Sequence, residues 1–342
     1  MKRALPYALL LASVMTSPLM AQDDRGLLGG DFRVAVDGEI NTSGMYGSES
    51  GRVAHLKDSY VTLSGTFKDK IRAVITADLS RIFRENKVEL TDDFSLEEFI
   101  KEAYIEIREV GGAPVAIIVG KQPMAFGQNV QSMPIFSNNP LASLQEINEV
   151  MGVTVELSEG LFGLFDMAEV SAFETQGGDL QIGKIDGVSV RLSKMLTDQW
   201  LLTLSHAEMG NSHLSSGHER RTSIGLIGET QDGMLVGWVE GMYFSNNPQY
   251  PNANFGITAG GSIRVHETTD VIVEYTWIEK EVSQIALGVK TALTSNMTVG
   301  AEVRYNNYVE RKDDIVFGIN VTYSFGTSGN NRNENYLFGE KK

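Results

Sequence analysis

The chain has 342 residues, no cysteine, and 44 acidic against 29 basic side chains, for a formal net charge of -15. This acidic balance excludes a basic nucleic-acid binder, because neutralising phosphates requires a surplus of Lys and Arg. The absence of cysteine excludes disulfides, thiolate metal sites and cysteine nucleophiles.

The first 21 residues have the pattern of a secretory signal peptide. Lys2 and Arg3 precede an apolar stretch from Ala4 to Met15, and a cleavage site follows Ala21. The stretch is shorter than the ~20 apolar residues that a membrane-spanning helix requires. We therefore expect residues 1–21 to be removed on export. The exported chain would be either a soluble protein or a membrane β-barrel, in which apolar and polar residues alternate.

Alternation with a period of two dominates the chain from residue 32 onward. In the first run, Phe32, Val34 and Val36 alternate with polar residues, which is typical of a strand with one apolar face. The pattern predicts 16 strands, at residues 32–40, 61–67, 71–79, 103–107, 115–119, 151–157, 165–173, 187–194, 200–208, 221–229, 234–243, 255–265, 271–278, 284–291, 297–305 and 314–325.

The predicted connections alternate in length. Short ones are expected at 68–70, 111–114, 158–163, 195–199, 230–233, 266–270 and 292–296. Longer, more polar ones are expected at 46–57, 80–99, 122–149, 174–186, 209–220, 244–254, 279–283 and 306–313. Short turns at one end and long loops at the other are typical of outer-membrane barrels, whose short turns face the periplasm.

The polar face of the predicted strands carries many charged side chains. They are Arg33, Asp37, Glu39, Arg72, Asp78, Glu106, Arg108, Glu156, Glu169, Arg191, Arg264, Glu274, Lys290, Glu302 and Arg304. A packed sandwich core could not hold them, because burial costs several kcal/mol per ion, whereas a water-filled lumen hydrates them. The opposite face is apolar and suits lipid. The sequence therefore favours an all-β fold, a transmembrane antiparallel up-and-down barrel, over a soluble sandwich.

Two segments resemble Gram-negative outer-membrane proteins. The last strand, Ile315 to Phe325, resembles the terminal strand that the barrel-assembly machinery recognises. Gly120-Lys121-Gln122 with Phe126-Gly127 resembles the Gly-[Arg/Lys]-Gln-x-x-x-Phe-Gly element of phosphate-selective and siderophore-type porins, and residues 137–149 are similar to a loop of the siderophore-type family. The resemblance implies a barrel of the porin superfamily over residues 22–325, usually a homotrimer. Residues 326–342 would form a periplasmic tail.

The third long connection, 122–149, is unusually apolar for a loop. It contains Phe126, Met133, Ile135, Phe136, Leu141, Leu144 and Ile147. Folding into the lumen would bury these side chains. In the 16-stranded porins that the chain resembles, the third loop narrows the lumen, and the resemblance implies the same here. Asn139-Pro140 predicts the start of a short helix over 141–149. The alternative is a loop that covers a partner interface or packs outside the rim.

A pore constriction is the predicted functional site. We expect the loop to face arginines of the wall, with Glu146, Glu149 and Gln128 on the loop and Arg33, Arg72 and Arg108 opposite them. Acids opposed by arginines create a transverse field that disfavours apolar solutes. The inward set holds seven bases and eight acids, which predicts little charge preference from the wall and argues against phosphate selectivity.

Two other kinds of site have weaker support. A metal site would use His206, His213, His218, Glu208 and Glu219, but their spacing matches no fixed motif. A hydrolase would need a Ser–His pair, and the adjacent Ser205 and His206 point to opposite faces of a strand. The chain also lacks a Gly-x-Ser-x-Gly element.

The sequence thus predicts an outer-membrane porin with no enzymatic activity, metal or cofactor. It would pass small polar solutes by passive diffusion and contact lipid and lipopolysaccharide. The alternative function is a substrate-specific, siderophore-type porin that takes up a chelate without TonB.

Overall fold

The computed structural model describes residues 31–56, 59–80, 99–128, 130–135, 138–158, 163–175, 183–210 and 218–326. The predicted signal peptide lies outside the described residues, as does the predicted tail beyond Gly326.

Strands make up most of the described chain. They are β1 (Phe32–Gly47), β2 (Gly51–Leu56), β3 (Tyr60–Phe67), β4 (Ile71–Asp78), β5 (Ile100–Ile107), β6 (Val115–Met124), β7 (Ile147–Ser158), β8 (Met167–Phe173), β9 (Gly187–Thr197), β10 (Trp200–Met209), β11 (Glu219–Glu229), β12 (Leu235–Ser245), β13 (Phe255–His266), β14 (Thr269–Ile278), β15 (Val282–Thr294), β16 (Met297–Tyr308) and β17 (Asp314–Gly326). Each of the 16 predicted strands is present.

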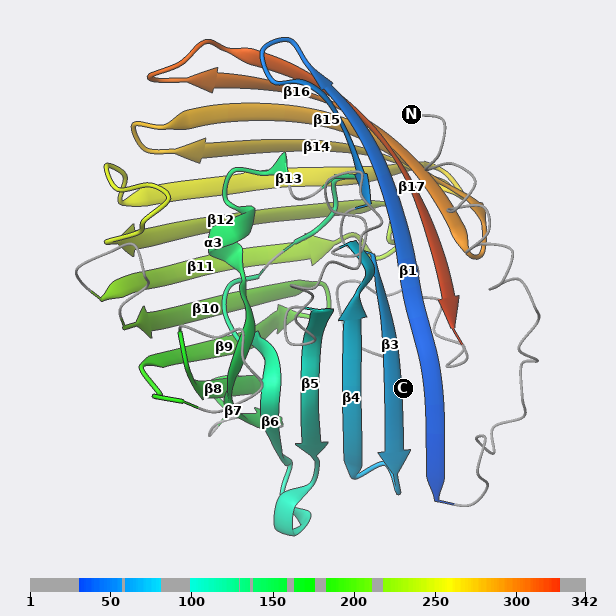
Figure 1. Ribbon diagram of the computed structural model, residues 1–342, viewed down its shortest axis with the longest axis vertical. Coiled ribbons are helices and arrows are strands. Elements are labelled where there is room, and N and C mark those ends of the chain that lie inside the picture. Colours follow the sequence, from blue (N-terminus) through cyan, green and yellow to red (C-terminus); the bar gives the residue numbers. More distant parts are fainter. Residues whose placement is uncertain are drawn as a thin grey trace, which may run out of the picture.

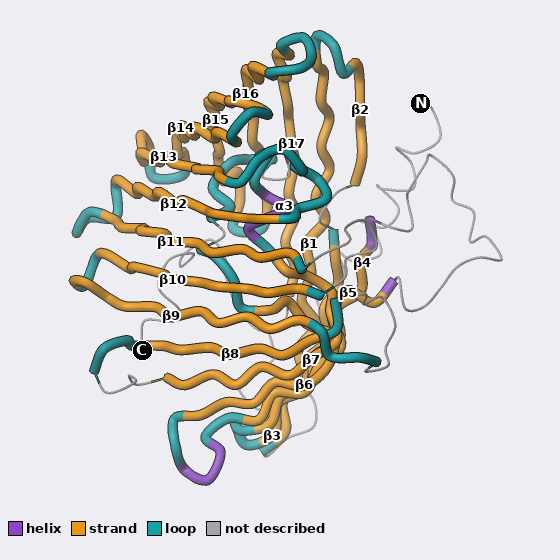
Figure 2. Tube along the Cα trace, turned by 90° about the vertical axis from the view of Figure 1, so that its left-hand side faces the viewer, coloured by secondary structure: helices purple, strands orange, loops and turns teal. Residues whose placement is uncertain are grey.

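The strands form one closed antiparallel sheet (Figures 1 and 2). From β3 to β17 each strand pairs with the next along the chain, and β1 pairs with β17 to close the ring. β2 and β3 pair with the same edge of β1, β2 along its second half and β3 along its first. They therefore count as one strand of the barrel, and the predicted 16-stranded up-and-down topology is confirmed.

Two of the predicted long loops are wrong. The segment 46–57 is mostly strand, because β1 continues to Gly47 and β2 returns from Gly51 to pair with it. The connection predicted at 279–283 is a tight turn, since Ile278 still pairs with Val282. In both places the two strands of a hairpin stay hydrogen-bonded beyond the residues in which apolar and polar side chains alternate.

The two faces of the sheet differ as predicted. On β15, Ile285, Leu287 and Val289 are exposed on the outside, whereas Gln284 and Ala286 are buried on the inside. The register also places predicted polar residues on a common face, because Glu169 pairs with both Glu156 and Arg191. Exposed aromatic side chains lie near both ends of the strands, among them Phe67, Trp200, Tyr243, Phe255 and Phe317. This distribution is typical of a barrel with interfacial aromatic girdles.

The helices of the described residues are few and short. In the part of the chain that the structure describes, none has the length and apolar character of a membrane-spanning helix.

A charge on the outer face should destabilise the barrel in lipid. Leu287 lies near the middle of β15 and is 51% exposed. We expect Leu287→Arg to lower the free energy of unfolding by ~2–4 kcal/mol, the cost of an arginine at the bilayer midplane. Asn41→Arg, on the inward face of β1, is the matched control and should cost much less, because water hydrates it. Urea unfolding in lipid vesicles measures both, and equal losses would contradict the assignment of the faces.

Candidate functional site

The described residues between β6 and β7, 125–128, 130–135 and 138–146, enter the barrel and form the candidate site. They carry α3 (Ala142–Gln145), which lies inside the ring of strands (Figures 1 and 2). The predicted helix over 141–149 is too long. Only one turn forms, because Ile147 already pairs with Met124 and starts β7. The predicted start is confirmed, since the side-chain oxygen of Asn139 accepts a hydrogen bond from the backbone N–H of Leu141 at 2.8 Å.

The apolar side chains of the loop are buried against the inner wall. Phe126, Met133, Ile135, Leu141, Leu144 and Ile147 are all at most 6% exposed. Phe126, Leu141 and Leu144 join a cluster with Met242 and Phe244 of β12. Burial of each such side chain contributes about 1.5–3 kcal/mol, which offsets the entropy lost on ordering the loop. The prediction of a third long loop folded into the lumen is confirmed, although the predicted Phe136 lies outside the described residues.

Glycines of the inner wall let the loop approach the strands closely. A Cβ at Gly256 would lie 2.7 Å from Cδ2 of Leu141, and a Cβ at Gly300 would lie 2.6 Å from Cβ of Pro134. Gly225, Gly288 and Gly318 also face loop atoms at under 3.0 Å. A strand glycine often marks such a close approach of another segment.

Gly300→Val should therefore displace both Pro134 of the loop and the side chain of Asn320, whose Oδ1 would also clash with the new Cβ. Proline is rigid and cannot yield as a flexible side chain would, so we expect a loss of ~1–3 kcal/mol in unfolding free energy from overpacking. Gly44→Val on β1 is the matched control, because a Cβ at that position would have nothing within 4 Å. Urea unfolding and single-channel conductance test both variants. A Gly300→Val barrel with the stability and conductance of the control would contradict the close packing.

Glu240 of β12 holds both ends of the loop. Its carboxylate accepts hydrogen bonds from the backbone N–H of Gln128 and from the side-chain amide of Gln145, both at 3.1 Å. It also accepts one from the hydroxyl of Ser223, and the side chain is almost fully buried. A charged acceptor with three donors compensates the cost of burial that an isolated carboxylate would incur.

Arg221 of β11 binds the carbonyl groups at the end of α3. Its Nη1 atom donates to the backbone oxygens of Leu144 and Glu146 at 3.2 Å and of Ser143 at 3.3 Å. These are the carbonyls that a helix end leaves without an internal partner. The Nε atom donates to Glu219 at 2.8 Å, which neutralises the buried guanidinium.

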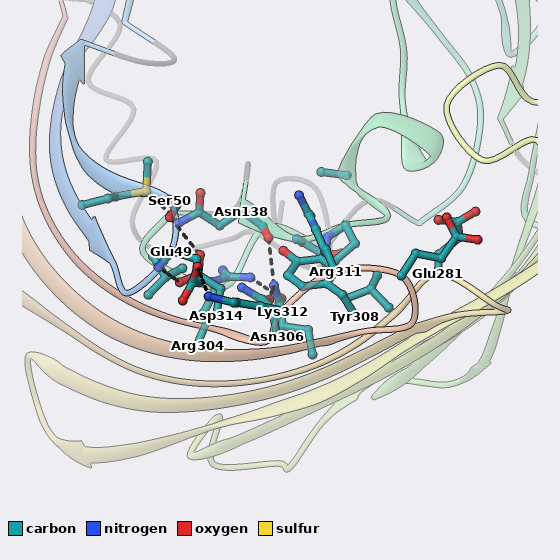
Figure 3. A pocket seen from close by; sticks show the side chains of 18 of the residues that line it. Glu49, Ser50, Asn138, Glu281, Arg304, Asn306, Tyr308, Arg311, Lys312 and Asp314 are labelled. Carbon is teal, nitrogen blue, oxygen red and sulfur yellow. Dashed lines mark hydrogen bonds and ion pairs between the residues drawn. The ribbon is translucent and has the colours of Figure 1, made fainter.

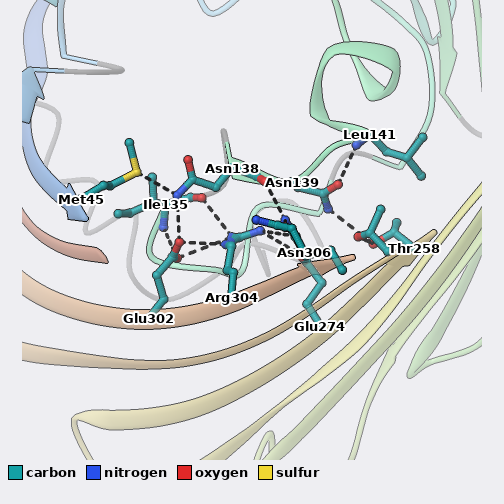
Figure 4. A network of polar contacts seen from close by, with 12 residues as sticks. Met45, Ile135, Asn138, Asn139, Leu141, Thr258, Glu274, Glu302, Arg304 and Asn306 are labelled. Carbon is teal, nitrogen blue, oxygen red and sulfur yellow. Dashed lines mark hydrogen bonds and ion pairs between the residues drawn. The ribbon is translucent and has the colours of Figure 1, made fainter. Parts of the chain in front are cut away.

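Arg304 of β16 forms the second anchor (Figure 4). Its Nη2 atom donates to the backbone oxygen of Ile135 at 3.0 Å, and its Nε atom donates to Glu302 at 2.8 Å. Glu302 in turn accepts from the backbone N–H of Ile135 at 2.9 Å. Arg304 also donates to Gln284 at 2.7 Å and lies 3.5 Å from Glu274. Both backbone groups of one loop residue are thus held by a buried ion pair of the wall.

Tyr250 fixes the same loop from a neighbouring loop, the one between β12 and β13. Its hydroxyl donates a hydrogen bond to the backbone oxygen of Pro140 at 2.6 Å. Burial raises the pKa of Tyr250 to about 12. The hydroxyl therefore stays protonated at physiological pH and can keep donating.

The predicted loop residues contact the wall mainly through their backbones. Gln128 does so through its N–H, and its side chain packs against Gly225. The carboxylate of Glu146 accepts from the side chain of Gln131 at 2.7 Å, and its backbone oxygen binds Arg221. Glu149 lies in β7 with a φ of 59°.

The predicted wall arginines lie toward the short-turn end. Arg33 pairs with Asp69 in the turn after β3, at 3.4 Å. Arg108 pairs with Glu106 at the end of β5, and Glu106 is opposite Arg72 in register. The arginines that bind the loop are Arg221 and Arg304, which the sequence did not single out for this role.

Ser205 and His206 lie on opposite faces of β10, as predicted. The Ser205 hydroxyl accepts a hydrogen bond from the backbone N–H of Gly127 at 3.0 Å, inside the barrel. The His206 ring lies 2.9 Å from the Thr222 hydroxyl on the exposed face. Among the described residues, no three His, Cys, Asp or Glu side chains are placed to hold a metal ion. His213 lies outside the described residues.

A closed sheet with an apolar outer face, a charged inner face and a loop bound inside defines a membrane-spanning barrel with a narrowed lumen. Comparison with known proteins bears on the fold. No protein-family model matches the chain, and no curated protein sequence matches it.

Solved outer-membrane channels are similar to the chain in fold. The outer-membrane channel DcaP of Acinetobacter baumannii is 13% identical, with a TM-score of 0.64 over 89% of this chain and 99% of that one. The anion-selective porin from Comamonas acidovorans is 12% identical, with a TM-score of 0.59 over 86% and 100%. OmpT of Vibrio cholerae, in its trimer form, is 11% identical, with a TM-score of 0.59 over 86% and 100%. The fold is therefore that of the Gram-negative outer-membrane porins.

Proposed function

We propose that the chain is an outer-membrane porin through which small polar solutes diffuse passively. The observation that carries this proposal is the loop bound inside the barrel. The strand side chains that bond it come from β1, β10–β13 and β15–β16. The wall of β4–β9 carries charged residues, namely Arg72, Glu106, Glu156, Glu169 and Arg191. A polar passage between the loop and that charged wall suits hydrated solutes.

The charged residues of the inner wall favour a weakly selective pore. The similar barrel from Comamonas is described as anion-selective. In this chain, acids and bases are nearly balanced on the predicted inward face, and Glu169–Arg191 and Glu106–Arg108 are ion pairs. We therefore propose little preference between small anions and cations in the constriction formed by the loop.

The assembly and processing of the chain also belong to the proposal. We propose a homotrimer in outer-membrane lipid and lipopolysaccharide, since OmpT of Vibrio cholerae has a trimer form. The last strand, Asp314–Gly326, would be the segment recognised by the barrel-assembly machinery. Residues 1–21 would be cleaved on export, and the residues after Gly326 would lie in the periplasm.

Conductance in planar bilayers tests the proposal. The purified full chain should give stable open steps, and liposomes containing it should swell in small sugars and amino acids but not in large oligosaccharides. A general pore gives steps insensitive to an added ferric chelate, whereas a siderophore-type porin shows block by the chelate. A chain that inserts as a folded barrel and conducts no ions would contradict the channel function itself.

A further inference from the structure

A cavity of about 900 Å³ opens at the long-loop end of the barrel (Figure 3). The folded-in loop forms one side through Asn138 and Pro140, and the turns after β14 and β16 form the other. We call this cavity the outer vestibule. Its volume lies in the range of sites that enclose small organic ligands.

The vestibule contains one cation, Arg311, and two anions, Glu281 and Glu310, for which the described residues provide no ion pair. The guanidinium carbon of Arg311 lies 3.5 Å from the ring centre of Tyr308. Arg311 also forms a side-chain hydrogen bond with Tyr308, so this contact positions the guanidinium group, whose other N–H groups can bind a carboxylate. Within the described part of the chain, neither Arg311 nor Glu281 forms an ion pair.

Lys312, Asp314 and Arg304 also line the vestibule, but each already has a polar partner. Lys312 pairs with Glu49 at 3.6 Å, and the carboxylate of Asp314 accepts hydrogen bonds from Ser48 and Ser50. Arg304 donates a hydrogen bond to Glu302. Arg311, Glu281 and the exposed Glu310 are therefore the charges that remain to bind a ligand, and Glu310 is next to Arg311 in the chain.

A backbone hydrogen bond joins the two turns that carry these charges. The N–H of Val309 donates to the backbone oxygen of Glu281 at 3.0 Å. Arg311 follows two residues after Val309, so the cation and the anion are carried by turns that are bonded to each other. Figure 3 shows both side chains at the edge of the same cavity.

We propose that the outer vestibule binds zwitterionic solutes, amino acids and dipeptides, before they enter the pore. Arg311 receives the carboxylate, and Glu281 receives the ammonium group. A simple anion is repelled by Glu281 and Glu310, and a simple cation leaves Arg311 without a partner, whereas a zwitterion pairs with Arg311 and Glu281 at once. The proposal rests on the proposed channel function, because it places the binding site on the route to the constriction.

Current block in a planar bilayer tests this inference on the full chain. Alanyl-alanine added to the long-loop side should interrupt the ion current in a concentration-dependent way. Arg311→Gln and Glu281→Gln should each weaken the apparent affinity about tenfold, the effect of removing one charged hydrogen-bond partner. Arg264→Gln, an exposed arginine paired with Asp270 near the other rim, is the matched control and should leave the block unchanged.

Two modified dipeptides test the ligand class. N-acetyl-alanyl-alanine lacks the ammonium group and alanyl-alanine amide lacks the carboxylate, so each should block about tenfold more weakly. Equal block by either one overturns the zwitterion site. Open steps without any block by the dipeptide also overturn this inference, while leaving the channel function intact. A folded barrel without open steps overturns the channel function.

Discussion

Removal of residues 128–145 from the folded-in loop is expected to raise the single-channel conductance about twofold or more, because the narrowest part of a pore dominates its resistance. The loop fills one side of the lumen, with its apolar residues packed on β12 and its backbone bonded to Glu240, Arg221 and Arg304. Without the loop, water takes its place. The same variant should admit larger sugars in liposome swelling.

The barrel itself should survive this deletion. Glu240, Glu302 and Arg304 lose their loop partners, but the emptied lumen hydrates them, so no charge is left buried without a partner. A heat-modifiable band on a gel gives the control for folding. If the deleted barrel folds and its conductance is unchanged, the loop does not limit the passage.

The alternation of apolar and polar residues predicted the barrel because one face of each strand contacts lipid and the other faces the lumen. The signal is clear on β15, where Ile285, Leu287 and Val289 point outward between small or polar inward residues. It is weak on β2, a short strand that depends on its backbone pairing with β1. The sequence therefore predicted the barrel strands well but mistook part of a long hairpin for a loop.

The loop changes the pattern of the strands beneath it. On β12 the inward side chains include Trp238, Met242 and Phe244, which are buried because the loop covers them. When the inward residues of a strand are apolar, the alternation along the strand does not show which face contacts lipid. Glu240 is the exception on that face, and its isolation among apolar residues was the available signal for an anchor.

The position of the folded-in loop was predicted, but its contacts with the wall were not. The apolar residues of the loop, such as Leu141 and Leu144, indicated burial from composition alone. Which arginines meet the loop depends on the height of each residue along the barrel. That height follows from the register between strands, which the alternation of side chains along each strand does not reveal. Arg33 therefore lies near the short turns, and Arg221 lies under α3.

Arg304→Leu is expected to cost the largest loss of stability among single substitutions in the loop anchors. The side chain of Arg304 is 1% exposed and lies between Glu302 and Glu274, which are as deeply buried. Its removal leaves two carboxylates together in a buried site without a cation. Breaking a buried ion pair by removing one partner costs ~3–5 kcal/mol. Arg264→Leu, which breaks an exposed pair with Asp270, should cost less than ~1 kcal/mol.

Urea unfolding in lipid vesicles, followed by tryptophan fluorescence, measures both losses. Adding Glu274→Leu and Glu302→Leu to Arg304→Leu should recover part of the stability, because no uncompensated charge then remains buried. The backbone N–H of Ile135 still lacks its acceptor in the triple variant, so the loop should stay loosely held and the open-channel current should be noisier. If Arg304→Leu loses no more unfolding free energy than Arg264→Leu, water already reaches these carboxylates, and the loop is held by its apolar packing instead.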